Sequence, residues 1–175
     1  MNKARIHVTV LRTRLAPLLI GVDESGDLVA MRFLDPASAD AELEAQRETW
    51  RERGHAVVDD TRACGRVASA VKDFLAGRST ALDLPRAKQG TPFQNSVWKA
   101  VARIGYGKTL SYKELARRIG RPTAVRAVAR ANATNPCALV IPCHRVIGSD
   151  GKATGYNGGI GVKEALLAME ARGAP

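Results

Sequence analysis

The stretch "IPCHRVIGSDG", residues 141–151, places a cysteine between a proline and a histidine and then runs into a glycine-containing loop. Pro142 restricts the backbone before Cys143, and we expect a turn or a helix start to follow. In an extended strand Cys143 and His144 would point to opposite faces, so they can cooperate only if the chain turns there. The apolar run just before it, residues 138–141, suits a buried strand.

The adjacency of Cys143 and His144 allows two interpretations. A neighbouring imidazole or a helix N-terminus lowers the pKa of a thiol, and the thiolate is the nucleophile in cysteine chemistry. Adjacency alone is more typical of a structural cysteine beside a surface histidine. Six glycines between residues 148 and 161 favour the nucleophile, because such a loop can approach a ligand closely or move as a lid. Glu164 or Glu170 could then orient the histidine, and sequence distance does not choose between them.

The other two cysteines are expected in the core. Cys64 falls on the apolar stripe of a helical segment, and Cys137 begins the apolar run before the motif. Three cysteines give no disulfide framework, and no pair has the spacing of a zinc site. The first half offers only Cys64, His7 and His55 as further zinc ligands of the Cys and His type, so we predict no zinc site.

Two capping boxes predict two helices upstream of the cysteine. In "TPFQNSVWKAVARI" (91–104), Thr91 is followed by a proline and, three residues on, by a glutamine. In "SYKELARRIG" (111–120), Ser111 is followed three residues on by a glutamate, and a glycine marks the end.

A third helix is predicted over "AVRAVARANAT" (124–134), with Thr123 as a candidate cap and an Asn–Pro pair as its end. Together with the preceding helix it has the spacing of a helix-turn-helix. Arg126 and Arg130 lie four residues apart and project on one side, so this face could contact DNA. The alternative is an ordinary helix pair with solvated arginines.

Charge is distributed unevenly along the chain. Residues 1–85 hold 12 Lys and Arg against 13 Asp and Glu, whereas residues 86–175 hold 15 against 4. The net charge of +10 therefore lies in the second half, which indicates a polyanionic partner, most simply nucleic acid. Arginine-rich composition serving solubility is the alternative, but acids balance the bases in the first half.

The first half predicts a small sheet with helices. Alternating apolar residues indicate one strand, and a turn at residues 24–27 then indicates a pair of strands on either side of it. Two helix-forming segments follow. These segments are 5–11, 17–34, 37–54 and 61–77. A polar, proline-containing connection comes next, so we place a boundary near residue 86, with one domain at 1–85 and a second at 86–175.

The sequence shows neither the pattern of a transmembrane span nor that of a signal peptide. No segment resembles a transmembrane span, and the N-terminus lacks the apolar core and cleavage site of a signal peptide. We therefore expect a cytoplasmic protein with free thiols, associated with the nucleoid if its source is prokaryotic.

Several motifs together resemble the O6-alkylguanine-DNA alkyltransferases, the methylated-DNA–protein-cysteine methyltransferases. They are "IPCHRVIG", the upstream "SYKELA" and "RAVARANATNP", and the downstream "GYNGGIGVKEALLAME". The resemblance runs in register over residues 84–170, is highly specific at PCHR and is weak in the first half. It implies an α+β fold, with a ribonuclease-H-like N-terminal α/β domain of structural role and a mainly helical C-terminal domain containing a helix-turn-helix.

The resemblance implies direct-reversal DNA repair. An alkyl group on O6 of guanine in double-stranded DNA would pass to Cys143 once and irreversibly, after the damaged base is flipped out of the duplex. O4-alkylthymine is a second candidate substrate. The protein would act as a monomer, without a cofactor or a metal.

The resemblance also implies roles for individual residues. His144 would deprotonate the thiol of Cys143 through a water, and Glu170 would orient the histidine. Tyr112 would assist flipping and protonation of the leaving guanine, and Asn135 would support the turn. These catalytic residues are Cys143, His144, Glu170, Tyr112 and Asn135, with Arg145 as a structural partner. Arg126 would fill the place vacated in the base stack. The DNA-binding set is Arg126, Tyr112, Thr123, Ala127, Arg130 and Ala131, and the substrate pocket is Pro142, Val146, Tyr156 and Asn157.

The chain departs from the family pattern at two positions, and three other functions compete. Asn157 bears on the tolerance of bulky alkyl groups, and Arg130 adds a phosphate contact, which predicts a steeper salt dependence of DNA binding. A catalytically silent lesion sensor on the same fold would lack Cys143. A cysteine hydrolase would need an oxyanion hole and would turn over repeatedly. A helix-turn-helix transcription regulator would not need the PCHR motif.

Overall fold

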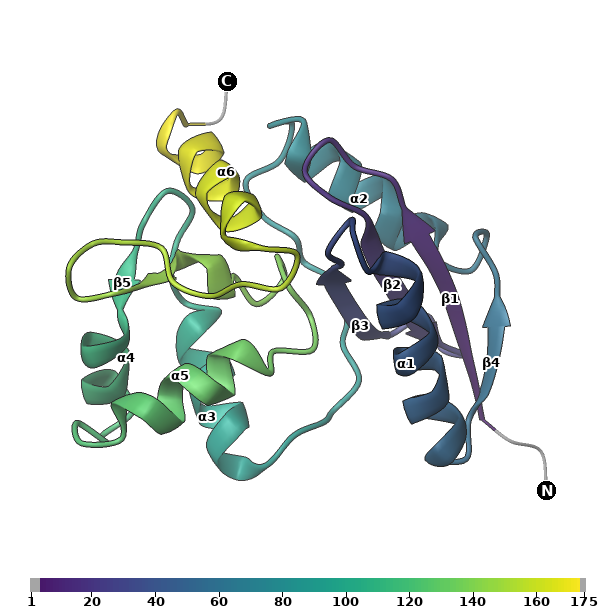
Figure 1. The fold of residues 1–175 in the computed structure, drawn as a ribbon, viewed down its shortest axis with the longest axis horizontal. Helices are drawn as coiled ribbons and strands as arrows, with labels where there is room; N and C mark the ends of the chain where they lie inside the picture. The colour runs from purple at the N-terminus through teal and green to yellow at the C-terminus, as the bar shows by residue number, and fades with distance from the viewer. Residues whose placement is uncertain (1–3, 174–175) are drawn as a thin grey trace.

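The computed structural model describes residues 4–173 as a four-stranded sheet with two helices, packed beside a mainly helical half (Figure 1). The arrangement is α+β, because the strands of this sheet and most of the helices are segregated along the chain. The ends of the two predicted domains, residues 1–3 and 174–175, lie outside the described part.

The four strands lie in the order β3-β2-β1-β4. β1 (Arg5–Leu11), β2 (Leu18–Asp23) and β3 (Leu28–Phe33) pair antiparallel, as expected for consecutive strands joined by short connections. These three strands confirm the predicted strand at 5–11 and the predicted pair of strands within 17–34. β4 (Ala56–Asp59) was not predicted; it pairs parallel with β1 at the opposite end of the sheet from β3.

Two helices cover the two faces of this sheet. α1 (Ala39–Glu52) packs Trp50 against one face, where it meets Leu19. α2 (Gly65–Leu75) packs on the other face, where Ile20 lies, because successive residues of a strand point to opposite sides. Both helices were predicted.

The second half contains four helices, a short 3-10 turn and a pair of two-residue strands. These elements are α3 (Pro92–Val101), β5 (Leu110–Ser111), α4 (Tyr112–Arg118), α5 (Val125–Ala133), η1 (Cys143–Arg145), β6 (Val146–Ile147) and α6 (Ile160–Ala171). β5 and β6 pair in parallel, which ties the start of α4 to the segment that follows η1.

The helix caps agree with the sequence in one case and differ in two. The box at Thr91 and Gln94 is complete. Ser111 accepts the expected backbone hydrogen bond, but the Glu114 carboxylate turns to Arg118 at 3.3 Å, so only half of that box forms.

The prediction that Thr123 caps the third helix is wrong. α5 begins after Ala124, and no side chain caps it. A backbone hydrogen bond of 2.9 Å from Ala124 N to Arg121 O closes the preceding turn, which leaves Thr123 exposed within that turn.

The apolar run before the motif does not form the predicted strand. Ala138 N donates to Met31 O of β3 at 2.7 Å, and the chain then reverses, with Leu139 at a positive φ of 69°. Asn135 holds both ends of this reversal, because its amide donates to Ile141 O at 2.8 Å and accepts from Cys137 N at 3.0 Å. The side-chain bonds of one asparagine replace the ladder that a strand would use.

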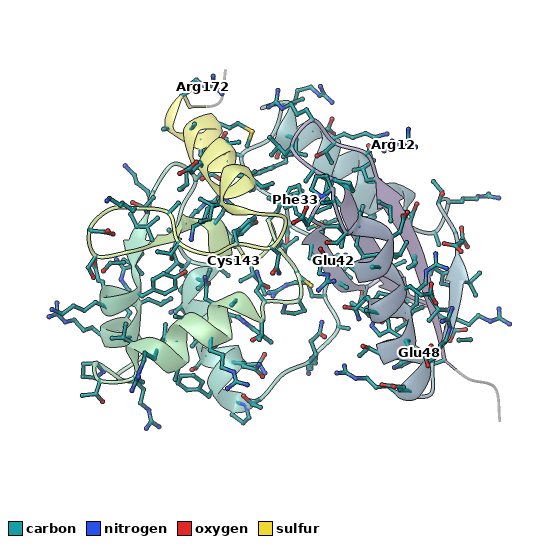
Figure 2. The ribbon with its side chains drawn as sticks, in the orientation of Figure 1. Arg12, Phe33, Glu42, Glu48, Cys143 and Arg172 are labelled. Atoms are coloured by element: carbon teal, nitrogen blue, oxygen red, sulfur yellow. The ribbon has the colours of Figure 1, made fainter. Side chains whose placement is uncertain are left out.

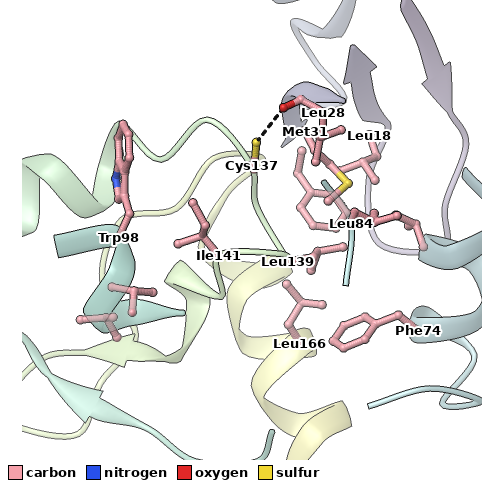
Figure 3. Packing of buried hydrophobic residues seen from close by; sticks show 14 of the residues in the cluster. Leu18, Leu28, Met31, Phe74, Leu84, Trp98, Cys137, Leu139, Ile141 and Leu166 are labelled. Atoms are coloured by element: carbon pink, nitrogen blue, oxygen red, sulfur yellow. Dashed lines mark hydrogen bonds between the residues drawn. The ribbon is translucent and has the colours of Figure 1, made fainter. Parts of the chain in front are cut away.

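One hydrophobic core joins the two halves. Figure 3 shows residues of the sheet packed with residues of the turn before η1 and with α6. Cys137 lies at this junction, and Cys64 lies beneath the sheet; both are buried as predicted. Burial raises the pKa of Cys137 to about 12 and that of Cys64 to about 11, so both thiols stay protonated at neutral pH.

Candidate active site

Cys143 begins the short turn η1, which confirms that the chain turns after Pro142. Cys143 N donates to Ile141 O at 2.7 Å, and Arg145 N donates to Pro142 O at 2.9 Å. Figure 2 places Cys143 in the helical half, at the side that faces the sheet. From α5, the Asn132 side chain donates to the Cys143 carbonyl at 3.3 Å, so the helix also holds the turn in place.

Glu170 of α6 links the two residues that follow the cysteine. Its Oε1 accepts from His144 Nε2 at 2.8 Å, and both of its oxygens accept from the Arg145 guanidinium at 2.8 Å. His144 and Glu170 are both buried. Glu164 is exposed on the same helix, so the structure selects Glu170 from the two carboxylates that the sequence left open.

Gly107 contributes a further donor to this carboxylate. Its N–H donates to Glu170 Oε2 at 3.0 Å. Its φ is +69°, and an added Cβ would lie 3.1 Å from the Glu170 carbonyl oxygen. Both features require glycine at this position.

The charge states of Glu170 and His144 determine which ring nitrogen of the histidine carries the hydrogen. Burial acts to raise the pKa of Glu170, but hydrogen bonds from His144 and Arg145 outweigh it and lower the pKa to about 2. Burial lowers the pKa of His144, so the imidazole is neutral. Since an ionised carboxylate only accepts, His144 Nε2 carries the hydrogen and Nδ1 is left as an acceptor. Nδ1 is buried and has no hydrogen-bond partner within residues 4–173.

The thiol of Cys143 is protonated at rest, which differs from the low-pKa thiolate that the sequence suggested. Burial raises its pKa, while the Asn135 amide, the Lys163 ammonium and the Tyr156 hydroxyl act in the opposite direction. The physical reason is burial, which disfavours the thiolate, and the neighbouring imidazole is neutral and so adds no positive charge to offset it. Proton transfer to a base must therefore accompany attack by this sulfur.

Tyr156 and the glycine-rich loop cover the site. The Tyr156 ring lies edge-on to His144, with centroids 6.5 Å apart, and its hydroxyl is buried without a hydrogen-bond partner in the described part of the chain. Gly158 has a φ of +79°, and an added Cβ would lie 2.6 Å from the Phe33 Cβ of β3. The loop therefore approaches the sheet too closely for any other residue at this position.

Sequence reasoning missed Lys163, which lies near two predicted site residues, Tyr112 and Cys143. It is fully buried in α6, its Nζ donates to Thr154 O at 3.0 Å, and it sits 5.8 Å from the centre of the Tyr112 ring. Burial lowers its pKa, while Cys143 acts to raise it. The available signal was its spacing, because it is seven residues before Glu170 and so lies on the same side of the helix.

The predicted DNA-binding residues lie mainly on one exposed surface. Arg126, Ala127 and Arg130 are exposed on α5, and Thr123 is exposed just before it. Two residues of the predicted set differ. Tyr112, the first residue of α4, is half-buried, and its hydroxyl lies 3.4 Å from Thr154 Oγ1. Ala131 is only 3% exposed and packs in the core, while its carbonyl accepts from Trp98 Nε1 at 2.8 Å. It is therefore a packing residue rather than one available to DNA.

The residues predicted to form the substrate pocket differ in exposure. Pro142 and Val146 are buried, and Cys143 is 7% exposed. Asn157 is exposed and lines a cavity of about 320 Å³ on the side of the sheet, together with Asn135.

A buried thiol, a neutral imidazole with one free nitrogen and an ionised carboxylate behind it form a site for covalent transfer to sulfur. The site lies in the strongly basic half of the chain, which also presents the exposed Arg126 and Arg130 on α5. Fold and site thus define a cysteine-dependent transferase directed at a polyanion.

Comparison with known proteins identifies the family. The model described as "6-O-methylguanine DNA methyltransferase, DNA binding domain" matches residues 92–172. The methylated-DNA–protein-cysteine methyltransferase of Methanosarcina barkeri is 38% identical over 165 residues, covering 94% of this chain and 97% of the relative. That of Mycobacterium bovis is 39% identical over 170 residues, covering 97% and 95%. The chain belongs to the methylated-DNA–protein-cysteine methyltransferase family.

Solved structures agree with this assignment. The Mycobacterium tuberculosis O6-methylguanine methyltransferase superposes with a TM-score of 0.79 at 37% identity, covering 97% of this chain and 95% of that chain. The Mycobacterium tuberculosis OGT in complex with DNA gives a TM-score of 0.78 at 38% identity, with the same coverage. The protein is thus a DNA-binding methyltransferase of direct-reversal repair.

Neither a membrane-spanning helix nor a metal-ligating cluster occurs within residues 4–173. Among them, no helix has the length and apolar character needed to cross a bilayer. The His, Cys, Asp and Glu side chains of this part form no cluster of three that could hold a metal ion.

Proposed function

We propose that Cys143 takes the alkyl group from O6-alkylguanine in double-stranded DNA, once per molecule. The observation that carries this proposal is the free Nδ1 of His144, held as an acceptor by the bond from Nε2 to Glu170. It supplies a base for the one proton that must leave the sulfur.

The transfer is a single displacement. His144 Nδ1 takes the Cys143 proton through a water, and the sulfur attacks the saturated carbon attached to O6. The carbon–sulfur bond forms as the carbon–oxygen bond breaks, and the electron pair stays on the guanine. The guanine gains a proton with the help of Tyr112, and the imidazolium returns its own proton to solvent. The product is a thioether, so the sulfur is consumed and no cofactor or metal is needed.

DNA is held by the basic helical half. α4 and α5 act as a helix-turn-helix, with Arg126 filling the space left by the flipped base and Arg130 contacting phosphate. Thr123 and Ala127 lie on the same exposed surface and contact the backbone. Residues 86–175 form the acceptor domain, and residues 1–85 form a ribonuclease-H-like domain that supports it. The protein acts as a monomer in the cytoplasm, and O4-alkylthymine is a second substrate.

The loop with Tyr156 admits the base. Cys143 is only 7% exposed, and movement of this loop would widen the access of a guanine to its sulfur. Pro142 and Val146 then provide backbone to the opened pocket, and Asn157 lies at its edge. The glycines between residues 148 and 161 give this loop the freedom to move.

Stoichiometry tests the proposal. The protein is mixed with excess duplex DNA that carries one O6-methylguanine, and both the intact protein mass and the unmodified guanine are measured over time. The expected result is a single burst that stops when each protein has gained one methyl group, and no burst in Cys143→Ala. Product beyond one equivalent would indicate a hydrolase, and DNA binding without any mass gain would indicate a silent lesion sensor; either result overturns the proposal.

A further inference from the structure

Three neighbouring cavities lie along the segment that joins the sheet to the helical half, and they share lining residues. Their volumes are about 320, 320 and 350 Å³, and Gln89 lines all three. Lys88 lines two of them, and so does Arg53 at the end of α1. The segment that leads into α3 passes here, between α1 and α5 (Figure 1). We call this connected hollow the interdomain groove.

The groove is lined by more cations than anions. Its basic residues are Arg5, Arg32, Arg53, Arg86 and Lys88, and its acidic residue is Asp23. The Asp23 carboxylate accepts from the N–H groups of Ser25 and Asp27 in the β2–β3 turn through its Oδ1, and its single negative charge leaves the lining with a net positive charge.

The cations of the groove are largely unpaired. Arg32 reaches Glu42 only at 3.5 Å, and its Nε has no hydrogen-bond partner among the described residues. Within residues 4–173, no carboxylate lies within ion-pair distance of Arg53 or Lys88, and both side chains are exposed. A hollow with this charge balance suits a polyanion.

The groove continues the exposed surface of α5. Thr134, directly after α5, lines both the groove and a shallow hollow that includes Ala127 and Arg130. The Thr134 hydroxyl accepts from Gln94 of α3 at 3.1 Å, and this hydrogen bond holds the Thr134 side chain in place between the two surfaces. A phosphate backbone that lies along Arg130 therefore has a direct path into the groove.

We propose that the interdomain groove binds the phosphate backbone of the DNA duplex beyond the part that α5 contacts. The proposal rests on the proposed function, because it assumes that α5 faces DNA. Arg53 and Lys88 are the principal contacts, since they are exposed and each borders two of the cavities. A long anion such as duplex DNA can reach α5 and both of these side chains at once, whereas an isolated phosphate cannot.

Salt dependence of DNA binding tests this proposal. The full chain is compared with the double variant Arg53→Gln, Lys88→Gln and with a control of equal charge change, Arg62→Gln, Arg66→Gln, whose side chains are exposed at the start of α2 and line none of the three cavities. Anisotropy titrations use undamaged duplexes of about 10 and about 20 base pairs, because about 10 base pairs is one helical turn. Each phosphate contact contributes roughly 0.9 to the slope of log K against log salt.

The expected result is a slope shallower by about 2 for the groove variant on the longer duplex only, with the control equal to the unchanged protein. Alkyl transfer from free O6-alkylguanine to Cys143 should be unaffected in both variants. Equal slopes for the groove and control variants would overturn the proposal. A groove variant that keeps the salt slope but loses a dependence of DNA affinity on protein concentration would also overturn it, because that result would indicate that a second copy of the chain occupies the groove. Failure of the unchanged protein to accept any alkyl group would instead refute the proposed function.

Discussion

The substitution Glu170→Gln tests two roles of one carboxylate: its buried ion pair with Arg145 and its orientation of His144, the proposed base. The Glu170 carboxylate accepts hydrogen bonds from His144, Arg145 and Gly107. Glutamine keeps the size of the side chain but removes its charge and turns one acceptor oxygen into a donor. The buried Arg145 then loses its counter-charge, and His144 loses the acceptor that fixes Nε2–H.

Two independent arguments give similar values for the free energy of unfolding that is lost in Glu170→Gln. Breaking one partner of a buried ion pair costs about 3–5 kcal/mol. The pKa of Glu170 falls from 4.5 to about 2 on folding, which corresponds to about 3 kcal/mol at neutral pH. Because the folded pKa is the lower one, this stabilisation is complete above pH 4.5 and is lost as the pH falls towards 2. The difference between the two proteins should therefore shrink across that range.

Urea unfolding as a function of pH measures this effect, and single-turnover alkyl transfer measures the consequence for the base. The rate should fall about 10²–10⁴-fold, the usual contribution of a positioned base. Glu164→Gln is the matched control, because Glu164 is exposed on the same helix, and its effect should stay within about 0.5 kcal/mol. An E170Q protein as stable as the control at pH 7 would refute the reasoning.

Three further substitutions probe the surroundings of the site. Arg126→Ala should slow repair of duplex DNA more than reaction with a free alkylguanine base; equal losses in the two rate assays would remove its base-flipping role. Gly107→Ala should cost about 1–3 kcal/mol in thermal or urea unfolding, because its φ is +69° and the added Cβ would press on Glu170, and an unchanged midpoint would contradict this. Lys163→Met should raise the pKa of Cys143 and slow transfer roughly tenfold for each pKa unit at neutral pH, so an unshifted pH–rate profile would exclude an electrostatic role.

Local signals predicted the elements whose determinants lie close together in the sequence. The box at Thr91, the alternation in β1 and the turn between β2 and β3 act within a few residues, and the elements formed as expected. β4 escaped prediction because its four residues are stabilised by β1, about 50 residues earlier. The run before the motif has strand composition, but Asn135 imposes a reversal that composition does not show.

The site was only partly accessible from the sequence. The resemblance supplied His144 and Glu170, and the spacing alone left Glu164 equally eligible until α6 was placed against η1. Lys163 and Asn132 were missed because their roles depend on burial and on contacts across elements, which no local pattern encodes. The protonated state of Cys143 likewise follows from burial, since the sequence shows a histidine beside it but not the surrounding protein.

The location of the transferred group tests the central claim most directly. After reaction with duplex DNA carrying isotopically labelled O6-methylguanine, the protein is digested and each cysteine-containing peptide is examined by mass spectrometry. We expect the label on Cys143 and unmodified thiols at Cys64 and Cys137, which are buried and protonated. Label on either of those two cysteines, with Cys143 unmodified, would contradict it.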